Sequence, residues 1–122
     1  MDDLTIKEIC KVAHQTSVEK GFYDNPPTIA DRLLLTHCEI SEAAEEVRED
    51  RLHIWYDTEK TVKRPNGTYL PKPEGVPVEL ADAIIRICDM ADYLNLPLER
   101  ALQEKLEYNK HREYKHGGKR FA

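Results

Sequence analysis

The sequence lacks any long apolar run, and no stretch of its 122 residues approaches the ~20 apolar residues that a membrane-spanning helix needs. The start, Met1-Asp2-Asp3, does not begin a signal peptide. We therefore expect no membrane partner, and we predict a cytoplasmic protein of one domain, residues 1–122.

The sequence also has few cysteines and no excess of basic charge. Its three cysteines, Cys10, Cys38 and Cys88, have no C-x-x-C spacing, which argues against a disulfide framework or a zinc site. The formal net charge is −5, whereas a general nucleic-acid binder would present a basic face. We therefore expect reduced thiols and no nucleic-acid partner.

Acidic residues are abundant, and four of them occur as two helical pairs. Glu39 and Glu42 are three residues apart, and so are Glu79 and Asp82. Because residues three apart lie on one face of a helix, each pair can direct two carboxylates at one point. Clustered carboxylates suit a hard divalent cation, so these four acids are candidate metal ligands.

The acids that follow Glu42 support this interpretation. Like charges recur at i,i+4 in the pairs Glu42 and Glu46, Glu45 and Glu49, and Glu46 and Asp50. Each such pair destabilises an isolated helix by a few tenths of a kcal/mol, and a solvated face would normally interleave Lys or Arg. A lone E-x-x-E motif usually marks a charged surface, but the second pair favours a cation site.

Hydrophobic periodicity, together with Gly and Pro stops, predicts four helices at about residues 3–20, 28–50, 77–94 and 98–114. Between the second and third, residues 51–76 contain three prolines and the hairpin signal Asn66-Gly67, which predicts a long irregular or hairpin arm. Residues 114–122 are predicted to form a flexible basic tail.

Trp55 lies at the start of the predicted arm. Its ring can stack on a nucleobase, or it can anchor the arm against the core or a second subunit. Anchoring is slightly favoured, because large aromatic side chains usually pack.

The predicted fourth helix carries polar groups in line with its apolar stripe. The stripe that begins at Leu98 continues into Lys105, Asn109 and Arg112 within a sector of about 100°. Tyr108 lies beside them and belongs either to the core or to a pocket. On an inward face, two cations and an amide can meet phosphates and a sugar or base.

These motifs resemble the MazG-type, all-α nucleoside triphosphate pyrophosphohydrolases over about residues 28–120. That family carries E-x-x-E on one helix and E-x-x-D on a later one, followed by a Lys and an Asn four residues on. The resemblance implies an all-α, four-helix MazG-like bundle with the arm inserted between helices two and three. It also implies hydrolysis of a (deoxy)nucleoside triphosphate to monophosphate and pyrophosphate, as in nucleotide-pool housecleaning.

The resemblance further implies roles for individual residues. Mg²⁺, with Mn²⁺ as a possible substitute, would be bound by Glu39, Glu42, Glu79 and Asp82. Glu46 is a candidate additional ligand or general base. Lys105 and Arg112 would hold phosphate oxygens, and Asn109 would contact the ribose or base. Trp55 and Tyr108 are further candidate substrate contacts.

Three alternatives remain. A phosphoribosyl-ATP pyrophosphohydrolase-like enzyme would need the same metal chemistry. A di-iron bundle would need Glu-x-x-His on two helices, and neither acid pair is followed by such a His. A non-catalytic helical oligomeric binding module would keep the helices without turnover. In every case so short a helical chain is expected to self-associate as a homodimer or homotetramer.

Overall fold

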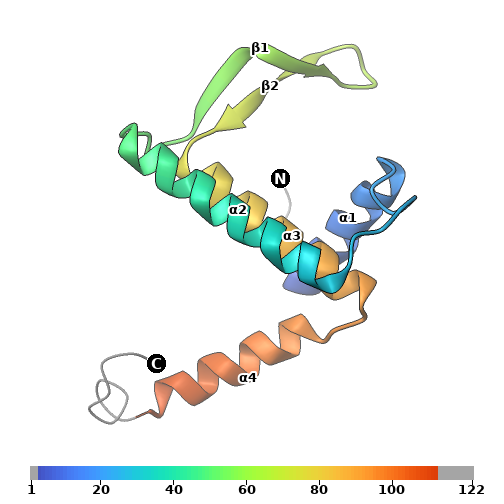
Figure 1. Ribbon diagram of the computed structural model, residues 1–122, viewed down its shortest axis with the longest axis vertical. Helices are drawn as coiled ribbons and strands as arrows, with labels where there is room; N and C mark the ends of the chain where they lie inside the picture. The colour runs from blue at the N-terminus through green and yellow to red at the C-terminus, as the bar shows by residue number, and fades with distance from the viewer. Residues whose placement is uncertain (1–2, 113–122) are drawn as a thin grey trace.

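The computed structural model describes residues 3–112, which form four helices and one two-stranded antiparallel sheet (Figure 1). The helices are α1 (Ile6–Glu19), α2 (Ile29–Arg48), α3 (Val76–Tyr93) and α4 (Leu98–Lys110), and the strands are β1 (Trp55–Lys63) and β2 (Tyr69–Glu74). The helices confirm the predicted ranges to within a few residues at each end. The predicted basic tail, residues 114–122, lies outside the described residues.

The prediction of an all-α fold is wrong, because the arm between α2 and α3 is a two-stranded β-hairpin. Its ladder runs from the Trp55 and Glu74 pair to the Lys63 and Tyr69 pair, with an irregularity after Asp57. The hairpin signal was correct: Gly67 has a φ of 89°, which favours glycine. The Asn66 side chain accepts a hydrogen bond from the Thr68 amide at 3.0 Å.

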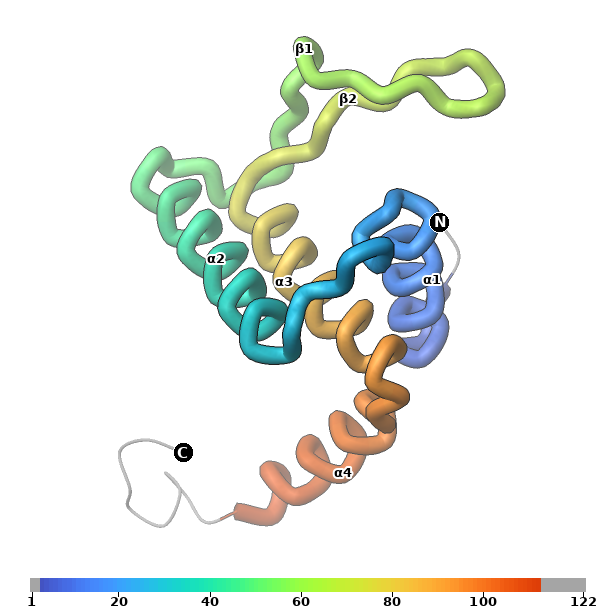
Figure 2. The backbone as a smooth tube through the Cα atoms, turned by 45° about the vertical axis from the view of Figure 1, so that its right-hand side comes forward, coloured from blue at the N-terminus to red at the C-terminus, as the bar shows by residue number. Residues whose placement is uncertain are grey.

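The helices pack around α3, which contacts α1 on one side and α2 on the other (Figure 2). The buried cluster between α1 and α3 consists of Cys10, Ala13, Cys88 and Ala91. These small side chains allow the two helices to approach closely. Within the described chain, α4 packs only slightly, mainly against α1, so the four helices do not form the closed bundle that was expected.

Local sequence fixes the helix starts that position the acids. Thr28 caps α2 through a reciprocal capping box with Asp31, which satisfies backbone donors at that end. Gly75 is the N-cap residue of α3, and its φ of 110° lies in the region that favours glycine. A Cβ there would overlap the His53 carbonyl oxygen, so only glycine lets β2 turn directly into α3.

None of the helices in residues 3–112 combines the length and apolar character required to cross a lipid bilayer.

Candidate active site

The two acid pairs meet where α2 and α3 run side by side in opposite directions (Figure 2). Oxygen atoms of Glu39, Glu42 and Glu79 lie within 4.8 Å of one another. Asp82, one turn beyond Glu79, is close enough for the Glu39 charge to affect its pKa. The structure therefore brings together three of the four residues predicted as metal ligands, and Asp82 lines the same cavity as Glu39.

A second carboxylate group adjoins the first and shares Glu79 with it. Oxygen atoms of Glu46, Glu74 and Glu79 meet the same 4.8 Å limit. Glu46 was expected as an extra ligand or base, but Glu74 was not expected. Glu74 is the last residue of β2, and it reaches the acids because Gly75 turns the chain into α3. The Nζ atom of Lys72 lies 2.9 Å from Glu74 Oε1.

The crowded carboxylates favour their protonated forms. Burial, a hydrogen bond with Glu42 and repulsion from the neighbouring acids raise the pKa of Glu79 to about 7. A hydrogen bond with Glu39, burial and the Glu39 charge raise the pKa of Glu42. Burial and Glu39 raise the pKa of Asp82, although Arg86 opposes the shift. A divalent cation can replace the protons that this cluster retains.

This electrostatic strain predicts how metal-free stability depends on pH. A carboxyl group with a raised pKa stabilises the folded state below its unfolded pKa, near 4.5 for Glu79, and that stability is lost as pH rises through about 7. We expect the metal-free Tm to fall between about pH 5 and about pH 8, and Mg²⁺ to raise Tm more at the higher pH. Differential scanning calorimetry with and without Mg²⁺ measures both changes.

Glu79→Gln serves as the control for that measurement. It should reduce the fall in Tm and much of the Mg²⁺ effect, because it removes the carboxyl group whose pKa is raised most. An Mg²⁺ effect of equal size at both pH values, or none at either, would contradict the prediction.

Arg86 is the cation closest to the first acid group, and no role had been predicted for it. Its Nε atom donates a hydrogen bond to Glu39 Oε1 at 2.7 Å, and its side chain remains 43% exposed. It follows Asp82 by one helical turn on the polar stripe of an otherwise apolar helix. This position on the polar stripe was the feature of the sequence that could have identified Arg86 as a site residue. From there Arg86 can pair with Glu39 or donate to a bound phosphate.

A cavity of about 460 Å³ adjoins the acids. It lies between the end of α1, the connector to α2, and the faces of α2 and α3. Glu39, Asp82 and Arg86 line it together with Arg32 and Asp89, and Leu35 and Ile85 contribute apolar wall. Its volume suits a small ligand, and its contact with the carboxylates makes it the candidate substrate cavity.

A polar network lies at the end of this cavity that is farther from the two acid pairs. Asp89 accepts hydrogen bonds from Ser17 at 2.9 Å and Tyr23 at 2.7 Å, and His14 Nδ1 lies 2.9 Å from it. Burial and the hydrogen bond to Asp89 raise the pKa of Tyr23 to about 12. Arg32 donates to the Tyr23 hydroxyl at 2.6 Å. Sequence reasoning missed this network, because its members come from α1, the connector, α2 and α3.

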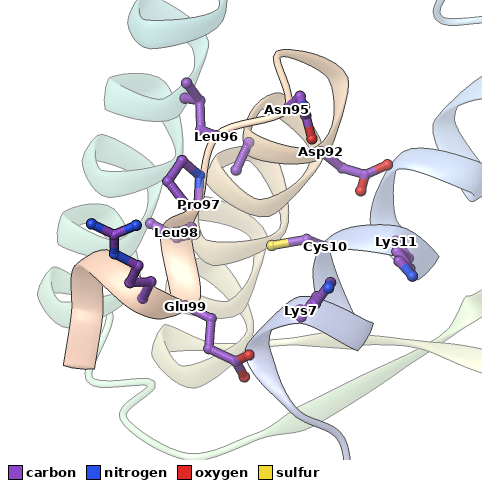
Figure 3. A pocket seen from close by; sticks show the side chains of 11 residues that line it. Lys7, Cys10, Lys11, Asp92, Asn95, Leu96, Pro97, Leu98 and Glu99 are labelled. Atoms are coloured by element: carbon purple, nitrogen blue, oxygen red, sulfur yellow. The ribbon is translucent and has the colours of Figure 1, made fainter. Parts of the chain in front are cut away.

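Another cavity, of about 520 Å³, lies where α1 meets the corner between α3 and α4 (Figure 3). Lys7 and Lys11 project from α1 on one side, and Asp92 and Glu99 lie across from them. None of the predicted site residues lines it. The candidate active site is therefore the smaller cavity beside the acid pairs.

The α4 residues are not brought to the acid pairs of the same chain. Both backbone views show α4 leaving the C-terminal end of α3, whereas the acid pair of α3 lies in its N-terminal half (Figures 1 and 2). Two of the predicted residues make cation–π contacts with Tyr108 instead. Lys105 Nζ lies 4.9 Å from its ring centre, and the Arg112 guanidinium carbon lies 5.8 Å from it. Asn109 is exposed beside them.

Trp55 lies at the base of the hairpin. It is the cross-strand neighbour of Glu74, and the Arg51 guanidinium lies 5.1 Å from its ring centre. The stacking of Arg51 on Trp55 and the pairing of Trp55 with Glu74 are typical of an aromatic residue that anchors the arm next to the second carboxylate group.

Comparisons with protein-family models, curated proteins and solved structures found no match.

Proposed function

We propose that this chain is a MazG-type nucleoside triphosphate pyrophosphohydrolase. It uses Mg²⁺, for which Mn²⁺ can substitute, to hydrolyse a (deoxy)nucleoside triphosphate to the monophosphate and pyrophosphate. The observation that carries the proposal is the convergence of Glu39, Glu42 and Glu79 oxygens within 4.8 Å, beside a cavity of about 460 Å³. Mg²⁺ prefers such oxygen ligands and bridges carboxylates to phosphates.

Each group in the site has a task in this reaction. Glu39, Glu42, Glu79 and Asp82 would hold Mg²⁺, which would neutralise triphosphate charge and help to activate the attacking water. Glu46, in the adjoining carboxylate group, adds a ligand or accepts the proton of the attacking water. Arg86, at the edge of the cavity, donates to a phosphate oxygen.

The products test this proposal. With Mg²⁺ and a panel of canonical and modified triphosphates, we expect nucleoside monophosphate and intact pyrophosphate to be formed together. A substrate with a methylene bridge between the α and β phosphorus atoms should resist cleavage, because it lacks the scissile oxygen. Phosphorus NMR identifies each product directly.

The same assay separates the alternatives. Orthophosphate as the first product would contradict cleavage between the α and β phosphorus atoms. Turnover of phosphoribosyl-ATP alone would identify the alternative substrate. Nucleotide binding without Mg²⁺-dependent turnover of any substrate would favour a non-catalytic binding module.

We also propose that the enzyme is a homodimer or homotetramer. α4 has no buried residue, and Leu102 and Leu106 are 39% and 61% exposed. Closed association of copies would cover such apolar surface.

Association also offers a role for the α4 polar residues. In a single chain Lys105 and Arg112 are separated from the carboxylates, so they act in hydrolysis by reaching the acids of a second copy. The free cysteines and the nucleotide substrate are consistent with a cytoplasmic enzyme.

A further inference from the structure

Arg32 is the most unusual charged residue beside the candidate substrate cavity. Its side chain lines the cavity, yet the residue is only 9% exposed. Its Nη2 atom is buried and has no hydrogen-bond partner among the described residues. Burying an unsatisfied charged donor is costly, so this nitrogen is suited to an acceptor that a ligand supplies.

The rest of the Arg32 guanidinium is held in place. Nη1 donates to the Tyr23 hydroxyl at 2.6 Å, and Nε donates to the Pro27 carbonyl oxygen at 3.2 Å. The rings of Tyr23 and Tyr93 lie with their centres 4.5 Å from the guanidinium carbon. Since these contacts fix both the plane and the rotation of the group, Nη2 is a preorganised donor rather than a mobile surface charge.

The spacing along the helices sets what can lie between Arg32 and the acids. Arg32 precedes Glu39 by seven residues on α2, or about 10.5 Å along the helix axis. Asp82 and Asp89 have the same separation on α3, at the two ends of the same cavity. A nucleotide with its phosphates at the acids would therefore extend its sugar and base toward Arg32.

We propose that this cavity binds the nucleobase, and that Arg32 Nη2 donates to a carbonyl oxygen on the base edge remote from the sugar. This inference rests on the proposed hydrolysis of nucleotides. Uracil, thymine, guanine and hypoxanthine carry a carbonyl at that edge. Cytosine and adenine carry an amino group, which would direct N–H groups at the Arg32 N–H groups. Leu35 and Ile85 supply apolar wall for the faces of the base.

Nucleoside monophosphates test base recognition without hydrolysis. Calorimetric titration in the presence of Mg²⁺ should show that UMP binds at least about 10-fold more tightly than CMP, and IMP than AMP. Within each pair the bases differ at the remote edge, where an oxygen replaces an amino group. Arg32→Met should reduce both preferences to within about twofold, because it removes the donor. Circular dichroism checks that the variant folds.

A second pair of variants tests the cavity without changing Arg32. Leu35→Trp, on the cavity wall, should weaken UMP binding by about 10-fold or more through steric blocking. Leu34→Trp is the matched control, because Leu34 is 63% exposed and does not line the cavity. It should bind UMP as the unaltered protein does.

Three results would overturn the inference: equal affinity within both nucleotide pairs, preferences that persist in folded Arg32→Met, or full UMP binding by Leu35→Trp. These outcomes are separate from failure of the proposed function. A protein that binds UMP selectively and hydrolyses no triphosphate would keep the base site while refuting the catalytic role.

Discussion

Replacing Glu42 by Gln is expected to lower turnover by a factor of about 10² to 10³ while leaving the helices intact. Glu42 is an exposed residue whose oxygen lies within 4.8 Å of oxygens of Glu39 and Glu79. Gln keeps the size of the side chain but removes the negative ligand. Initial-rate kinetics with Mg²⁺ measure the loss, and circular dichroism checks the fold. Asp82→Asn should behave in the same way.

The stability of this variant separates a functional acid from a structural one. The pKa of Glu42 is raised, so ionisation of this group destabilises the metal-free protein. Without metal near pH 8, Glu42→Gln should therefore have a Tm equal to or above that of the unaltered protein, and the Mg²⁺-induced rise in Tm should shrink. A strong fall in metal-free Tm would instead assign Glu42 to the scaffold.

Glu45→Gln is the matched control for this experiment. Glu45 is also exposed on α2, three residues beyond Glu42, but it belongs to neither carboxylate group. Its replacement should change turnover by less than about twofold, since it removes no ligand. Equal losses at Glu42 and Glu45 would indicate a general effect of acidic charge and would count against a specific metal site.

Local spacing allowed the carboxylate site to be predicted. Glu39 and Glu42, and likewise Glu79 and Asp82, share a helical face whatever the rest of the chain does. The packing of α2 against α3 was then enough to bring the pairs together. The hairpin turn was predictable for the same reason, since Asn66-Gly67 encodes it locally. The fold class was wrong because the irregular or hairpin arm was treated as an insertion into an all-α fold, whereas it forms a two-stranded sheet.

Other parts of the site depend on contacts between distant segments. Tyr23 and Asp89 are 66 residues apart in sequence, and Arg86 and Glu39 are 47 apart. No local pattern specifies such contacts. The direction of α4 could not be predicted from the sequence either, because a helical wheel shows which residues share a face but not where the helix points. The chain turns between α3 and α4 at Asn95, which has a φ of 55°.

Mixing two inactive variants is expected to restore activity if α4 serves a second copy of the chain. Lys105→Ala removes a phosphate contact, and Glu42→Gln removes a metal ligand, so each variant alone should be strongly impaired. In a mixed dimer, the intact acids of one chain can meet the intact Lys105 of the other. Random reassortment makes half of the dimers mixed, each with one complete site, so about a quarter of full activity should return.

The experiment requires subunit exchange, which brief incubation in mild denaturant followed by dilution provides, and light scattering verifies the assembly. Lys110→Ala mixed with Glu42→Gln is the control for the preparation. Lys110 ends α4 at a position outside the stripe that carries Lys105, so Lys110→Ala should be active before mixing. If the Lys105→Ala and Glu42→Gln mixture stays inactive although the chains exchange, Lys105 acts within its own chain or has no part in catalysis. If Lys105→Ala alone is fully active, α4 serves assembly and Arg86 is the remaining candidate for the phosphate contact.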